Sequence, residues 1–192
     1  YSPSSGVNVY YISTGYILST DATLSGITLS SGTLSPEFDP GVTSYTAEVP
    51  VGTSTVTVSA FANNQFATIE GDGEVDVSSG SGTATITVTA EDGSTTEVYT
   101  IDFSVAKSDD ASLSNLTLDA GILIFDAGTF TYNVVLPAGT TSVTVTATTN
   151  DANATVTGDG VIDVSSGSGT ATVVVTAEDG TTTETYTINF TV

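Results

Sequence analysis

Acidic side chains supply almost all of the groups in this sequence that could do chemistry. The 192 residues include 22 Asp and Glu but a single basic residue, Lys107, and they contain no His, Cys, Met or Trp. Such a chain has no histidine base, no cysteine nucleophile and almost no cation to stabilise an oxyanion, so only carboxylate chemistry is left to it. Two carboxylates can hydrolyse a glycosidic bond when a cleft holds them about 5–10 Å apart. Because the acidic residues are scattered over short turns, the sequence predicts that the protein is not an enzyme.

Calcium binding is the second use to which these carboxylates could be put. Calcium takes about six to eight oxygen ligands that converge on one point. The acidic residues recur mostly in Gly-Asp-Gly and Glu-Asp-Gly turns, where Asp is also favoured for backbone reasons, and no DxDxDG loop is present. The sequence therefore predicts no obligatory cofactor and leaves calcium as an alternative. Its candidate ligands are Asp72, Asp76, Asp109, Asp110, Asp159 and Asp163.

The charge balance excludes two classes of partner. The formal net charge is −21 at pH 7, and a field of that sign repels nucleic acid and anionic lipid headgroups. No stretch approaches the ~18 continuous apolar residues of a membrane-spanning helix. Since the chain contains no Met and starts at Tyr1, we expect that a leader peptide has been removed and that the protein is extracellular or displayed on a cell surface.

Three N-glycosylation sequons make glycans a further alternative partner. They begin at Asn115, Asn153 and Asn189. In a Thr-rich chain such matches arise by chance. Asn153 is the best acceptor because it is predicted to lie in a loop, whereas the other two are predicted to lie in strands.

The chain contains two copies of one sequence unit. Residues 71–105 align with residues 158–192 without a gap, with 27 identities in 35 positions. The match extends back through both copies with one two-residue deletion near Pro36. The predicted organisation is an N-terminal segment at 1–20, a first repeat at 21–105, a linker at 106–109 and a second repeat at 110–192.

Each copy alternates apolar and polar residues with the period of two that is typical of half-buried strands. In the run TATITVTA, Ala84, Ile86, Val88 and Ala90 share one face and the threonines share the other. Asp-Gly turns separate such runs, which predicts hairpins. The expected fold is all-β, with two tandem immunoglobulin-like β-sandwiches of about seven strands each.

The ordered series of motifs also carries a family resemblance. The run LSGITLSSGTLSPEFDPGVTSYTAEVPVGTSTVTVSA, followed by TVTAEDGSTTEVYTI, resembles the bacterial cadherin-like β-sandwich repeat family. The second copy departs from the pattern where GILIFDAGTF replaces GTLSPEFDPGVTS, so we expect a loop of different shape there. The resemblance implies a secreted or surface-displayed module, often in tandem, without enzymatic activity.

The N-terminal segment belongs to neither copy. Within it, Val7, Val9 and Tyr11 alternate with Asn8, Tyr10 and Ile12, which predicts an additional apolar strand. A free strand of this kind needs a partner. It either pairs within its own chain or inserts into a neighbouring subunit by strand addition.

Apolar substitutions on the second copy mark a candidate interface. Where the first copy has Glu48, Glu74 and Thr87, the second has Val135, Val161 and Val174, and Ile122 and Ile124 add further apolar side chains. In the opposite direction, the first copy has apolar residues where the second is polar, at Phe61, Phe66 and Val98. Such substitutions suit surfaces that another chain covers, and ordinary drift is the alternative.

Two functions fit these observations. The first is a structural subunit of an extracellular filament, pilus-like fibre or surface layer that self-associates through its N-terminal strand, with itself as partner. The second is an adhesion, carbohydrate-binding or spacer module of a larger secreted protein. The absence of Trp and the core-like positions of Tyr45, Tyr99, Tyr132 and Tyr186 disfavour a carbohydrate-binding platform.

Overall fold

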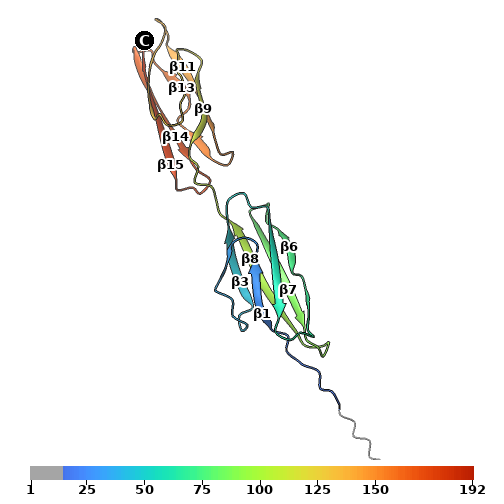
Figure 1. The fold of residues 1–192 in the computed structure, drawn as a ribbon. Helices are drawn as coiled ribbons and strands as arrows, with labels where there is room; N and C mark the ends of the chain where they lie inside the picture. Colours follow the sequence, from blue (N-terminus) through green and yellow to red (C-terminus); the bar gives the residue numbers. More distant parts are fainter. Residues whose placement is uncertain (1–14) are drawn as a thin grey trace, which may run out of the picture. The chain divides into compact units, whose positions relative to one another are not determined.

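The protein folds into two compact units that divide between Ala106 and Lys107. A computed structural model describes residues 15–192, and every element in that range is a β-strand (Figure 1). None of these residues belongs to a helix that is long and apolar enough to cross a membrane. The predicted all-β fold with two tandem β-sandwiches is confirmed.

Unit 1 contains the first repeat and has eight strands in two sheets. One sheet has the order β1-β4-β6 and the other has the order β2-β3-β8-β7-β5. The strands are β1 Leu24–Leu29, β2 Thr33–Ser35, β3 Ser44–Val49, β4 Thr55–Ala62, β5 Thr68–Glu70, β6 Gly73–Asp76, β7 Ser81–Thr89 and β8 Thr96–Val105.

Unit 2 contains the second repeat and has seven strands in the same arrangement. Its sheets have the orders β9-β11-β13 and β10-β15-β14-β12. The strands are β9 Leu113–Leu118, β10 Thr131–Val135, β11 Ser142–Thr149, β12 Thr155–Thr157, β13 Gly160–Asp163, β14 Ser168–Thr176 and β15 Thr183–Thr191.

The core of each unit lies between its two sheets and is built from the inward-facing residues of the alternating runs. Ile86 and Val88 of β7 are fully buried, as are their counterparts Val173 and Val175 of β14. Burial of such side chains contributes roughly 1.5–3 kcal/mol each. The alternation in the sequence therefore identified the core face of these strands correctly.

Buried tyrosines tie the start of each repeat to its core. The Tyr99 side chain is fully buried, and its hydroxyl accepts a hydrogen bond of 3.2 Å from the backbone N–H of Leu24. Tyr186 makes the same 3.2 Å contact with the N–H of Leu113 in unit 2. Burial raises the pKa of both phenols. These residues are part of the core, as expected from the sequence.

The units differ at one edge of the larger sheet. In unit 1, β2 pairs antiparallel with the outer side of β3, through Thr33 opposite Glu48 and Ser35 opposite Thr46. In unit 2, the corresponding residues 122–124 form no strand, and β10 is the end of its sheet. The sequence predicted a loop of different shape here, and the difference is the loss of this edge strand.

Candidate functional site

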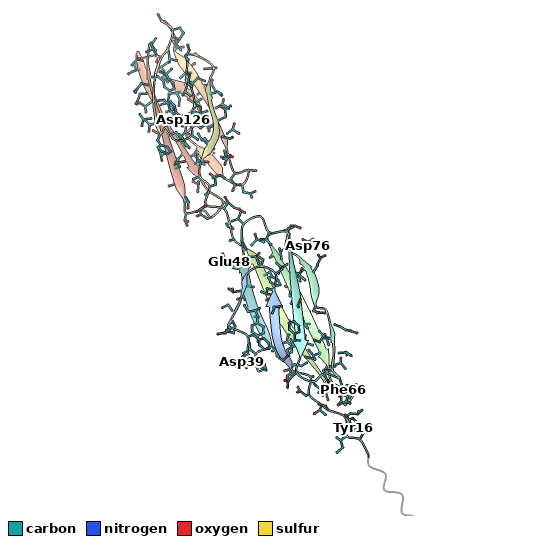
Figure 2. The ribbon with its side chains drawn as sticks, viewed as in Figure 1. Tyr16, Asp39, Glu48, Phe66, Asp76 and Asp126 are labelled. Carbon is teal, nitrogen blue, oxygen red and sulfur yellow. The ribbon has the colours of Figure 1, made fainter. Side chains whose placement is uncertain are left out.

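The predicted self-assembly strand lies outside the residues that the structure describes. It consists of Val7, Val9, Tyr10, Tyr11 and Ile12. The described chain begins at Gly15, and the exposed side chains of Tyr16, Ile17 and Leu18 follow (Figure 2). These three residues form no strand.

Ser19 fixes the point at which this N-terminal segment joins unit 1. Its backbone N–H donates a 3.1 Å hydrogen bond to the Glu91 carboxylate, and its carbonyl accepts a 3.1 Å hydrogen bond from the N–H of Asp92. Ser108 of unit 2 makes the equivalent bonds with Glu178 and Asp179, at 3.2 and 3.1 Å. Sequence reasoning missed this junction, although the shared Ser-x-Asp-Ala pattern at both positions is its signal.

Three of the six acidic residues considered for calcium accept hydrogen bonds from neighbouring groups. Asp76 and Asp163 each accept a 2.8 Å hydrogen bond from the backbone two residues later. Asp110 accepts hydrogen bonds from Ser112 and, at 2.7 Å, from the Asn150 side chain. Hydrogen bonds of this kind lower the pKa of all three carboxyl groups.

The candidate calcium ligands do not meet. Between Gly15 and Val192 there is no group of three or more acidic side chains placed to hold a metal ion. Asp72, Asp109 and Asp159 are exposed. Calcium binding stays an alternative from the sequence, without a preformed acidic cluster in residues 15–192.

The three sequon asparagines lie where the sequence placed them. Asn153 is exposed in the loop between β11 and β12, whereas Asn115 lies in β9 and Asn189 lies in β15. The Asn189 side chain contacts Asn133 and Thr170. Asn153 is accordingly the acceptor with the most accessible surroundings.

Two of the predicted interface residues line one hollow on unit 2. Ile122 and Val135 have exposed fractions of 83% and 76%. Together with Gly121, Leu136 and Pro137 they line a hollow of about 620 Å³ beside β10, the edge strand of the larger sheet. Ile124, which is 84% exposed, follows on the same segment. We call Ile122, Ile124 and Val135 the apolar rim.

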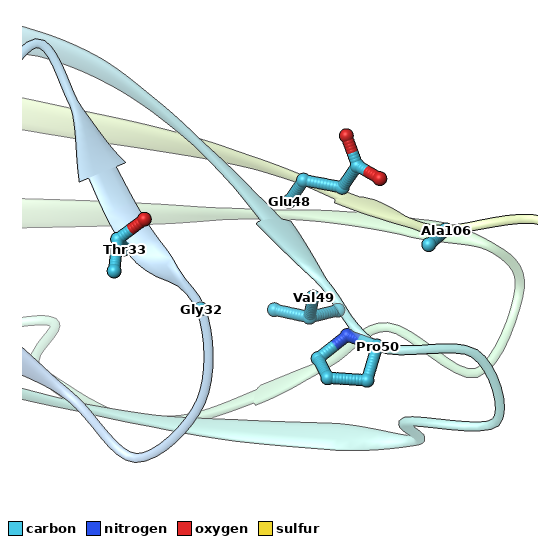
Figure 3. Close-up of a pocket in the computed structure, with 6 residues that line it drawn as sticks. All are labelled: Gly32, Thr33, Glu48, Val49, Pro50 and Ala106. Atoms are coloured by element: carbon cyan, nitrogen blue, oxygen red, sulfur yellow. The ribbon is translucent and has the colours of Figure 1, made fainter.

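The equivalent hollow on unit 1 carries polar side chains at two of the matching positions (Figure 3). It is lined by Gly32, Thr33, Glu48, Val49, Pro50 and Ala106 and has a volume of about 370 Å³. Thr33 and Glu48 stand where unit 2 has Ile122 and Val135, and the Glu48 carboxylate points outward from β3. The two repeats therefore differ in polarity at these two positions, whereas the rest of each hollow is similar.

The remaining predicted interface residues do not join the apolar rim. Val161 is 73% exposed but lies on β13, in the other sheet of unit 2. Val174 is half-buried on β14, and β15 separates it from β10. Val161 and Val174 therefore lie apart from the apolar rim, and the role of all five residues as an interface stays a prediction.

Exposed apolar side chains of unit 1 gather near its N-terminal junction. Phe61 lies opposite Gly26 of β1, and Phe66 follows in the loop between β4 and β5. Their exposed fractions are 52% and 56%. Figure 2 places Phe66 at the end of unit 1 from which Tyr16 extends.

A family model described as the cadherin-like beta sandwich domain matches this sequence twice, over residues 20–106 and residues 112–192. The chain belongs to the cadherin-like β-sandwich domain family. The family consists of extracellular adhesion and structural modules and is a non-enzymatic domain type. The resemblance inferred from the motifs is thereby confirmed. No curated protein matches the sequence.

Several solved structures align with most of this cadherin-like chain at low sequence identity. Protocadherin Gamma B2 extracellular cadherin domains 3-6 align at 8% identity and a TM-score of 0.34, over 79% of this chain and 46% of that one. Protocadherin Gamma B7 extracellular cadherin domains 1-4 align at 11% identity and a TM-score of 0.27, over 79% and 49%. A chimeric titin Z1Z2 aligns at 13% identity and a TM-score of 0.18, over 88% and 97%. The chain thus spans less than half the length of either protocadherin structure.

Proposed function

We propose that this protein is a structural subunit of an extracellular filament, pilus-like fibre or surface layer, and that copies associate through the strand at residues 7–12. The observation that carries the proposal is the N-terminal segment itself. It lies outside both family matches, is rich in apolar and aromatic side chains at residues 7–12, and contains no charged residue before Asp21.

The charge distribution supports a role for this segment in self-association. All 22 acidic residues lie at or after Asp21, so two copies repel one another through their folded units. An uncharged segment can approach such a unit without that electrostatic penalty. Strand addition would then supply backbone hydrogen bonds and bury its apolar side chains.

The placement of the strand favours an open assembly over a closed one. A segment at the N-terminus of one copy that binds the folded part of the next makes a head-to-tail contact, and such contacts generate filaments when the rotation does not close. The tandem sandwiches would provide the length and mechanical continuity of each subunit.

An adhesion or spacer module is the second candidate, and the family assignment favours it. Cadherin-like domains serve adhesion and structural roles outside the cell. Recognition of carbohydrate has less support, because all four tyrosines of the two sandwiches are buried and the exposed aromatic side chains of these sandwiches are phenylalanines, among them Phe61 and Phe66. Exposed aromatic platforms are the usual means of stacking on sugar rings.

Sedimentation velocity tests the proposed function. The full chain should form species that grow with protein concentration, whereas a chain lacking residues 1–14 should stay monomeric while keeping the Ser19 junction. Because the subunits repel one another, raising the salt concentration to about 0.5 M should promote association of the full chain. Monomers at all concentrations and salt levels would favour the adhesion or spacer module instead.

A further inference from the structure

We propose that the open edge of β10 is the acceptor for residues 7–12 of a second copy. This inference rests on the proposed function and names the surface that it requires. The open edge is the side of β10 that does not pair with β15. The proposal joins the N-terminal segment of one copy to repeat two of its neighbour.

The open edge lacks a strand that its counterpart possesses. In unit 1, three residues of β2 pair with the outer side of β3. In unit 2, no strand of the described range pairs with the outer side of β10, so its outward backbone groups are not part of a ladder. The irregular residues 121–124 lie beside this side, where a Cβ on Gly121 would meet Val134 and Leu136, but no backbone hydrogen bond joins them to β10. An incoming strand would therefore replace this segment along the edge. An unpaired edge of this kind is a template for an additional strand.

The apolar rim gives the same edge an affinity for apolar side chains. Ile122 and Val135 stand beside the edge with most of their surface exposed to solvent. An unpartnered surface of this kind on an otherwise Thr-rich and acidic sandwich marks an interaction site. Val7, Val9 and Tyr11 of the incoming segment would cover it.

Charge complementarity also selects this edge. Unit 1 carries Glu48 at the position of Val135 and sets it opposite Thr33, a polar neighbour. Apolar neighbours such as Val7 and Val9 would partly desolvate a carboxylate there, which is unfavourable. Neither β10 nor residues 120–125 contain a charged residue, and neither do residues 1–20. The uncharged segment and the uncharged edge therefore match within a chain whose net charge is −21.

The length of the segment is sufficient for this pairing. Six residues in extended conformation span about 20 Å, and the five residues of β10 span about 17 Å at about 3.3 Å per residue. Residues 13–18 then provide a tether of about 20 Å to the Ser19 junction. Each copy would thus offer one strand and accept one strand.

A pair of substitutions with natural precedents tests the acceptor. Val135→Glu introduces at the edge the residue that repeat one carries at the same position, Glu48, so the fold tolerates it. Val161→Glu is the matched control, because repeat one has Glu74 there and Val161 is exposed on the other sheet. We expect Val135→Glu to raise the concentration needed for assembly by about tenfold or more, and Val161→Glu to leave it within about twofold.

Disulfide cross-linking identifies the occupant directly, because the protein has no cysteine of its own. Chains carrying Val9→Cys are mixed under oxidising conditions with chains carrying Ile122→Cys. We expect a cross-linked product containing one copy of each chain. A mixture of Val9→Cys with Val161→Cys is the control and should yield little product.

The outcomes separate this inference from the proposed function. If Val135→Glu assembles normally but removal of residues 1–14 abolishes assembly, β10 is not the acceptor. The proposed function as a filament subunit would still stand. In a chain that carries both Val9→Cys and Ile122→Cys, a disulfide formed within one monomer would overturn the proposed strand exchange between copies. Failure of the unmodified full chain to assemble would overturn both proposals.

Discussion

At the residue scale, the carboxylates of this chain shape turns. Asp92 follows β7 and accepts hydrogen bonds from the backbone N–H groups of Ser94 and Thr95, at 2.9 and 2.8 Å. Its second oxygen accepts the Thr95 hydroxyl at 2.7 Å. Asp179 makes the same contacts in unit 2. These bonds favour the ionised form, so the pKa of both groups lies well below its ordinary value.

The lowered pKa values give a prediction about pH. A carboxyl group whose pKa is lower in the folded than in the unfolded state adds stability above its unfolded pKa of about 4, and that stability is lost as the pH falls through the folded pKa. We therefore expect Asp92→Asn to reduce the free energy of unfolding of repeat one at pH 7. The difference from the unmodified protein should shrink steadily below pH 4.

Urea unfolding followed by hydrogen exchange and mass spectrometry measures this difference for each repeat. Comparing variants at each pH cancels the general effect of the falling net charge. Asp72→Asn removes the same charge from an exposed turn and should produce a much smaller difference at pH 7. A difference for Asp92→Asn that stays constant from pH 7 to pH 2 would contradict this account.

At the element scale, the short turn between β12 and β13 depends on the lack of a side chain. Gly158 has a φ of +82°, and a Cβ atom placed on it would overlap the carbonyl oxygen of Thr172 on β14. Gly167 has a φ of +92°, but open space surrounds the position of its Cβ. Substitutions at the two glycines therefore distinguish two free-energy costs. One is the cost of a positive φ, and the other is the cost of steric overlap with Thr172.

We expect Gly167→Ala to destabilise repeat two by about 1–2 kcal/mol, the cost of a positive φ in an L-residue. Gly158→Ala should cost at least about 2 kcal/mol more, because the backbone of β14 must also move. Hydrogen exchange of repeat-two peptides in urea measures both values. Equal losses for the two variants would show that the contact with Thr172 has no energetic weight.

The alternation of residues predicted these elements better than it predicted their edges. Runs such as 83–90 have one apolar face, so their strands and core residues followed from the sequence. The sequence did not predict the absence of a strand at 122–124, because Ile122, Leu123 and Ile124 have high β-propensity. In the structure Leu123 packs against the core while its flanking residues stay exposed, and pairing with β10 depends on contacts that a single sequence does not contain.

At the scale of the whole molecule, the repeats diverge where an assembly would need them to. Repeat two carries the apolar rim beside β10, and repeat one has Thr33, Ser35 and Glu48 at the matching positions. Repeat one instead exposes Phe61 and Phe66 near the N-terminal junction. A head-to-tail assembly would use the N-terminal segment of one copy and repeat two of the next.

The sequence identified part of this site and not the rest. Ile122, Ile124 and Val135 were found because comparison of the repeats exposes a polar-to-apolar change. Val161 and Val174 showed the same change, but Val161 lies in the other sheet and Val174 lies two strands from β10 in the same sheet. The strand period fixes the face of a residue but not the position of its strand. The open edge of β10 became visible only from the strand order.

Electron microscopy of negatively stained protein tests the central claim most directly. The full chain is imaged beside a chain that lacks residues 1–14 and retains the Ser19 junction. The account predicts filaments or ordered sheets from the full chain and dispersed particles from the shortened one. Dispersed particles from both, at concentrations and salt levels that screen the net charge, would contradict it.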